Sequence, residues 1–84
     1  MRKTTATRRG YNIIGRRIRD ARLRLKPEVS QFDLAGRLAR HGLDMDRPTI
    51  TRIENGNRYV RDYEILALSR ALKVSVAWLF GQER

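Results

Sequence analysis

The sequence has no cysteine, a single histidine and only two prolines among its 84 residues. The absence of cysteine excludes a disulfide framework, a thiol nucleophile and the common zinc-finger spacings. One histidine leaves little for metal binding or acid–base catalysis, so we expect no catalytic residues, no metal and no cofactor. No apolar run approaches the roughly 20 residues of a membrane-spanning helix, and we expect no membrane partner.

Acidic residues are also scarce. Nine Asp and Glu stand against nineteen Lys and Arg, which gives a formal net charge of +10. The excess is uneven, because residues 1–26 hold ten bases and one acid whereas the rest of the chain is nearly balanced. A segment this basic favours a polyanionic partner. Charge alone does not exclude an anionic membrane or an acidic protein as the partner, but nucleic acid is the partner that ranks first.

The first eleven residues, MRKTTATRRGY, carry four basic side chains and no apolar periodicity. We interpret residues 1–11 as a flexible basic N-terminal arm that orders on DNA, with a solubilising tail as the alternative. Its candidate DNA contacts are Arg2, Lys3, Arg8 and Arg9. Residues 12–82 suffice for one small domain. The chain has no apolar segment of the secretory type, so we expect a cytoplasmic protein.

From Asn12 onward apolar residues recur at helical spacing, on a stripe made of Ile14, Ile18, Ala21 and Leu25. Pro27 ends this first helix, because its ring disfavours the helical conformation of the preceding residue. Ser30, with Asp33 three residues later, has the pattern of a helix N-cap. The second helix that begins there ends near His41-Gly42.

A third helix begins at the cap candidate Asp46, tolerates Pro48 in its first turn and ends at Asn55-Gly56. Asp62 is the predicted cap of a fourth helix. Ser75 is the predicted cap of a last turn that contains Val76, Leu79 and Phe80. No segment alternates between apolar and polar residues as a strand does, so we predict an all-α fold with five helices.

Only about four residues, Gly42 to Met45, join the second helix to the third, and so short a link is typical of a helix-turn-helix. On a helical wheel Ile50 and Ile53 point inward. The opposite side is polar and cationic, and it consists of Pro48, Thr51, Arg52 and Asn55, flanked by Arg47. This side suits the DNA major groove, where arginine donates two hydrogen bonds to guanine and the threonine methyl contacts thymine.

The ordered set SQFDLAGRLARHG, TITRIENGNR and LSRALKVSVAWLF resembles the lambda-repressor-like helix-turn-helix domains of the Cro/XRE type. The resemblance covers about residues 13–82, and the motifs are specific as a set although each is weak alone. It implies a five-helix domain whose recognition helix, about residues 46–55, enters the major groove of an operator. It also implies a twofold-symmetric pair that regulates transcription.

The resemblance assigns base reading to Arg47, Pro48, Thr51 and Arg52. It assigns phosphate contacts to Gln31, Asn55, Asn57, Arg58 and Arg61. It further implies a structural ion pair, between Arg22 and Glu54, that orients the recognition helix. The chain departs from the family pattern in two ways. The links before the second and third helices are longer than usual. Pro48 occupies a position of the recognition helix where it offers DNA only van der Waals contact.

We therefore interpret the chain as a sequence-specific double-stranded DNA-binding transcriptional regulator, in particular a repressor, that acts as a homodimer at least on DNA. One alternative is an antitoxin-type module that binds a toxin or other protein partner and uses DNA for autoregulation. Another is a non-specific nucleic-acid binder.

Two local questions stay open. The exposed arginines Arg16, Arg19 and Arg24 either contact DNA or face solvent, and Trp78 to Phe80 either close the core or join two copies.

Overall fold

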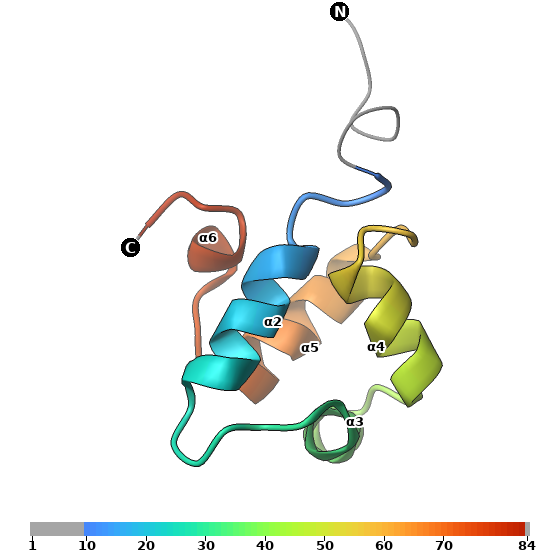
Figure 1. The fold of residues 1–84 in the computed structure, drawn as a ribbon, viewed down its shortest axis with the longest axis vertical. Helices are drawn as coiled ribbons and strands as arrows, with labels where there is room; N and C mark the ends of the chain where they lie inside the picture. The colour runs from blue at the N-terminus through green and yellow to red at the C-terminus, as the bar shows by residue number, and fades with distance from the viewer. Residues whose placement is uncertain (1–9, 84) are drawn as a thin grey trace, which may run out of the picture.

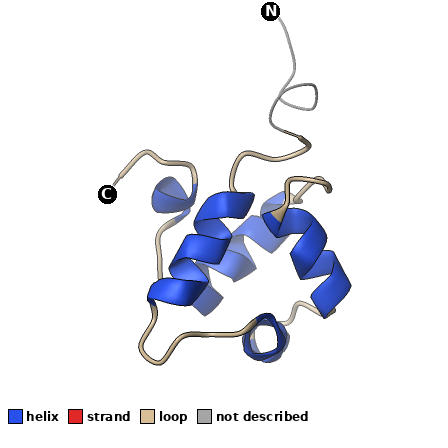
Figure 2. Cartoon of the chain, in the orientation of Figure 1, coloured by secondary structure: helices blue, strands red, loops and turns tan. Residues whose placement is uncertain are grey.

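The computed structural model describes residues 10–83, which form five helices, labelled α2 to α6 in Figure 1. They are α2 (Gly15–Arg24), α3 (Gln31–Arg40), α4 (Arg47–Glu54), α5 (Asp62–Leu72) and α6 (Val76–Leu79). No strand occurs between residues 10 and 83 (Figure 2). The predicted all-α fold with five helices is therefore confirmed.

The helices pack around one apolar core to which each of them contributes. α4 contacts α2 and α3, while α5 lies behind α2 and also contacts α3 and α6 (Figure 1). The largest fully buried side chains are those of Ile14, Ile18, Leu34, Leu38, Ile50, Ile53, Leu68, Leu72 and Leu79. Because α4 buries its apolar side against both α2 and α3, its opposite side faces outward.

Side-chain caps begin three helices at the predicted residues. The Ser30 hydroxyl accepts a hydrogen bond from the Asp33 N–H (3.0 Å), and the Asp33 carboxylate accepts one from the Ser30 N–H (3.4 Å). The Asp46 carboxylate accepts from the Thr49 N–H at the start of α4 (3.0 Å), and Ser75 caps α6 in the same way. These bonds satisfy amides that the first turn of a helix leaves without a partner.

Two predicted boundaries are wrong. Asp62, the predicted cap of the fourth helix, is the first residue of α5, and Arg61 holds the cap position. The reason is Glu64, whose carboxylate accepts the Arg61 N–H (2.9 Å) and so starts the helix one residue earlier. Phe80, predicted inside the last turn, follows the end of α6 and is 38% exposed, because Leu79 already fills the buried position.

The segment before α2 is held against the far end of α4. The Tyr11 N–H donates to the carbonyl of Gly56 (2.7 Å). The Asn12 amide donates to the carbonyls of Ile53 (3.1 Å) and Arg58 (2.8 Å), while its oxygen accepts the N–H groups of Ile14 (3.1 Å) and of Gly15 (2.8 Å), the first residue of α2. The packed domain therefore begins within the stretch that the sequence assigned to the arm.

At Gly15 the backbone of α2 lies so close to the backbone of α4 that no side chain fits between them. A Cβ atom at this position lies 2.1 Å from the carbonyl oxygen of Ile53. We expect Gly15→Ala to lower the free energy of unfolding by about 1–3 kcal/mol, because the two backbones must move apart. Urea unfolding followed by circular dichroism measures this change.

Gly36, in the middle of α3, supplies a matched control, since a Cβ atom there meets nothing within 4 Å. We expect Gly36→Ala to raise the free energy of unfolding by about 0.5–1 kcal/mol, because alanine is the better residue inside a helix. Equal stability of the two alanine variants contradicts the close contact between α2 and α4.

Candidate nucleic-acid interface

α4 has one buried side and one exposed side. Ile50 and Ile53 are each 1% exposed and face α2 and α3. The exposed residues follow at helical spacing and are Arg47, Pro48, Thr51, Arg52 and Asn55. They share one side of the helix, because positions three and four residues apart lie close on its surface. The outward side of α4 therefore carries two guanidinium groups, a hydroxyl and an amide.

A buried ion pair joins α2 to α4. Arg22 donates from Nε to Glu54 Oε2 (2.8 Å) and from Nη2 to Glu54 Oε1 (2.9 Å). The side chains are 9% and 4% exposed. The remaining Nη1 donates to the carbonyl of Val29 (3.1 Å), so the guanidinium also fixes the loop before α3. A bidentate pair of this kind restricts rotation of α4 about its own axis.

Gln31, at the first turn of α3, extends this network to the outward side of α4. Its amide nitrogen donates to Glu54 Oε1 (3.2 Å), and its oxygen accepts the Thr51 hydroxyl (2.9 Å). Gln31 is half-buried and Thr51 is exposed. Four residues from three helices are thus linked side chain to side chain, and they set how far α4 projects beyond α3.

The loop after α4 places some, but not all, of the predicted phosphate contacts at the surface. Asn57 and Arg61 are exposed. Together with Arg52 they line a hollow of about 560 Å³ that also includes two tyrosines. These three polar residues lie beside the end of α4, and Arg58 lines the same hollow.

Arg58, a predicted phosphate contact, forms an ion pair within the domain. Its guanidinium forms two hydrogen bonds with the Glu64 carboxylate, at 2.9 and 3.1 Å, and a third with the carbonyl of Tyr59. Glu64 is 4% exposed, and a buried carboxylate requires a charged partner. The guanidinium of Arg58 is therefore engaged within the domain, and its contact with a DNA phosphate stays a prediction.

A family model described as helix-turn-helix matches residues 18–79 of the chain. The chain belongs to the lambda-repressor-like, Cro-type helix-turn-helix family. The matched span contains α3 and α4, the two helices of the motif, with α5 and α6 behind them. The family consists of DNA-binding regulators. Searches of curated proteins and of solved structures gave no match.

Outside α4 this helix-turn-helix domain contains contacts that the sequence did not reveal. The Arg58–Glu64 pair and the hydrogen bonds of Asn12 are both absent from the sequence-based prediction. Asn12 carries a local signal, because asparagine is a favoured cap residue just before a helix. The four predicted arm contacts, Arg2, Lys3, Arg8 and Arg9, lie outside the described residues.

Within residues 10–83, no three His, Asp or Glu side chains gather closely enough to hold a metal ion. In the same part of the helix-turn-helix protein, no helix combines the length and the apolar character needed to cross a bilayer.

The Arg58–Glu64 pair makes the stability of the domain depend on pH. Burial raises the pKa of Glu64, but the hydrogen bonds from Arg58 and from the Arg61 N–H outweigh it and hold the pKa below its ordinary value. The same hydrogen bond raises the pKa of Arg58. A carboxylate with a lowered pKa stabilises the fold above its unfolded-state pKa. That stabilisation is lost as the pH falls through the folded-state value.

We expect Arg58→Met to lower the free energy of unfolding by about 2 kcal/mol at neutral pH, because Glu64 then stays buried without its partner. The difference from the wild-type protein shrinks as the pH falls, because Glu64 takes up a proton first in the variant, which lacks the guanidinium, and in the wild type only below its ordinary pKa. Urea unfolding across this pH range measures both effects. Arg40→Met, at an exposed position of α3, is the control. A difference between Arg58→Met and wild type that is the same at all pH values contradicts the assignment.

Proposed function

We propose that this protein is a sequence-specific transcriptional regulator that occupies a double-stranded DNA operator and acts there as a repressor. In this proposal α4 enters the major groove. The observation that carries it is the outward side of α4, which presents Arg47, Thr51 and Arg52 while its other side is clamped to α2 and α3. Groups held in this way suit base edges, because a bidentate contact discriminates only when its geometry is fixed.

The surroundings of α4 support the same proposal. Gln31 stands at the first turn of α3, where free backbone N–H groups favour a phosphate. Asn57 and Arg61 follow the other end of α4. Phosphate contacts on both sides of a recognition helix fix its register without reading sequence. The side chains of the protein supply the recognition chemistry, so the proposal includes no cofactor. It also places the protein in the cytoplasm with its operator.

Selection of bound duplexes from a random library at fixed salt identifies the operator. We then expect Arg52→Ala to reduce the preference for the selected duplex over a scrambled one by about tenfold to a hundredfold, because a bidentate base contact is lost. Arg61→Ala serves as its counterpart, since a phosphate contact affects both duplexes alike. Fluorescence anisotropy gives the two dissociation constants for each variant.

An unchanged preference in Arg52→Ala speaks against base reading by α4. Equal affinity of the wild-type protein for selected and scrambled duplexes instead favours the non-specific binder. The two outcomes are distinct, because the first concerns one side chain and the second the whole protein.

We further propose that two copies bind together on half-sites about one helical turn apart. The support is a hollow of about 310 Å³ whose lining includes no charged residue. Its exposed side chains are Tyr11, Ile13, Tyr59 and Phe80. Copies that each carry a net charge of +10 repel one another, so an uncharged surface is where they approach at least cost.

This uncharged surface is small. A stable interface buries about 1,200–2,000 Å² in total, and four partly exposed side chains supply less than that. We therefore propose a pair that forms on DNA and dissociates in free solution. Its position suits this role, because Tyr11 and Tyr59 also line the hollow next to Arg52, at the end of α4.

We expect Phe80→Lys to abolish cooperative binding to a duplex with two half-sites while binding to a single half-site stays within about twofold of wild type. The reason is a charge placed within the uncharged surface. Phe32→Lys is the control, since Phe32 is 71% exposed on α3 and lies outside this surface. Quantitative gel-shift titrations measure cooperativity. Cooperativity retained in Phe80→Lys assigns the surface to another partner, such as the toxin of an antitoxin-type module.

A further inference from the structure

The arginines of α2 divide into two groups, and the first is engaged within the domain. The Arg17 guanidinium carbon lies 3.9 Å from the centre of the Trp78 ring, and that of Arg24 lies 5.5 Å from it. Arg22 is buried in its pair with Glu54. These three arginines therefore have internal partners that explain their presence.

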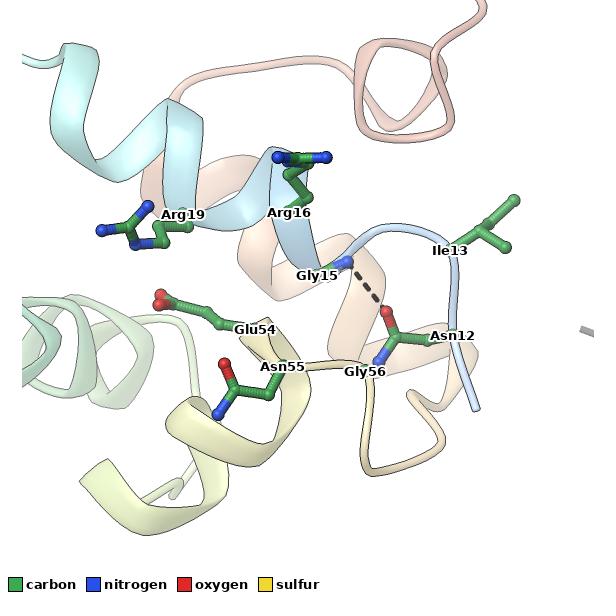
Figure 3. A pocket seen from close by; sticks show the side chains of 8 residues that line it. All are labelled: Asn12, Ile13, Gly15, Arg16, Arg19, Glu54, Asn55 and Gly56. Carbon is green, nitrogen blue, oxygen red and sulfur yellow. Dashed lines mark hydrogen bonds between the residues drawn. The ribbon is translucent and has the colours of Figure 1, made fainter. Parts of the chain in front are cut away.

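The second group consists of Arg16 and Arg19, which line a groove between α2 and α4 (Figure 3). The groove has a volume of about 730 Å³, and Asn55 lines its opposite wall at the end of α4. Both arginines are exposed. Neither forms an ion pair with any other residue in the described range 10–83.

Glu54 is the one acidic residue among the residues that line this groove. Its carboxylate accepts hydrogen bonds from Arg22, at 2.8 and 2.9 Å, and from Gln31, at 3.2 Å. The charge of Glu54 is thus already matched by Arg22. The groove keeps the positive charges of Arg16 and Arg19, and it suits an anion.

The groove is continuous with the candidate DNA interface. Glu54 lies between Arg19 and Gln31, and Gln31 in turn accepts the hydroxyl of Thr51 on the outward side of α4. A row of polar groups therefore follows one edge of α4 from the first turn of α3 to the first turn of α2. Arg16 and Arg19 are about 4.5 Å apart along the axis of α2, so both can reach the same oxyanion.

We propose that Arg16 and Arg19 together hold one backbone phosphate of the bound duplex in this groove. The contact fixes the path of the DNA strand past α2, and it adds affinity without adding sequence preference. Arginine is suited to this role because its guanidinium donates two parallel hydrogen bonds to phosphate oxygens. The proposal rests on the proposed function, since it needs α4 to lie against DNA.

The test is a double-mutant cycle on the selected duplex. Single phosphates are replaced one at a time by uncharged methylphosphonates, and each duplex is titrated with the wild-type protein and with Arg16→Gln/Arg19→Gln. We expect one backbone position at which the replacement weakens wild-type binding about tenfold but leaves the binding of the double variant unchanged. If the loss of affinity from the phosphate replacement and the loss from the double substitution multiply at every position, no phosphate is coupled to the two arginines. This result overturns the proposal.

Arg40→Gln/Arg70→Gln is the matched control, because it removes the same charge from exposed positions on α3 and α5. Between about 50 and 200 mM salt, we expect the slope of log affinity against log salt to become shallower by about 0.9 in Arg16→Gln/Arg19→Gln and to stay at the wild-type value in the control. Equal slopes in the two double variants mean that only net charge matters, which also overturns the proposal.

The result is separable from the proposed function. If the wild-type protein binds selected and scrambled duplexes equally, sequence-specific regulation fails, yet the salt slopes still decide whether the groove holds a phosphate. If sequence preference is confirmed and the slopes of the two double variants agree, the groove proposal fails alone. Circular dichroism of all variants verifies that each is folded.

Discussion

The buried carboxylate of Glu54 is the point on which the candidate DNA interface depends. It receives the guanidinium of Arg22 from α2 and the amide of Gln31 from α3, while its own helix carries the outward side chains. Burying a charge is costly unless it is paired, and removal of one partner from such a pair costs about 3–5 kcal/mol. α4 therefore has one strongly preferred rotation, and this rotation decides which of its side chains face a ligand.

Two backbone contacts act in the same direction as this ion pair. Gly15 lets the start of α2 approach the carbonyls at the end of α4, and Asn12 donates to the carbonyls of Ile53 and Arg58. The pair fixes the rotation of α4, and the contacts fix the position of its final turn. They also tie the beginning of the described chain to the end of α4.

Much of the fold could be predicted because its signals are local. The caps Ser30, Asp46 and Ser75 act within their own helices, and the apolar stripes follow from helical spacing. The outward side of α4 followed from the same spacing. The pairing of Arg58 with Glu64 could not be predicted, because the burial of the Glu64 carboxylate depends on tertiary packing. The contacts of Asn12 span more than forty residues and depend on tertiary packing.

Intermolecular nuclear Overhauser effects between the protein and a selected duplex test the central claim most directly. The account predicts contacts from the Thr51 methyl group and from Pro48 to base protons in the major groove. It also predicts contacts from Arg52 to the same few base pairs. Contacts confined to the Trp78 side of α2 or to residues 1–9, with α4 unaffected by DNA, would contradict it.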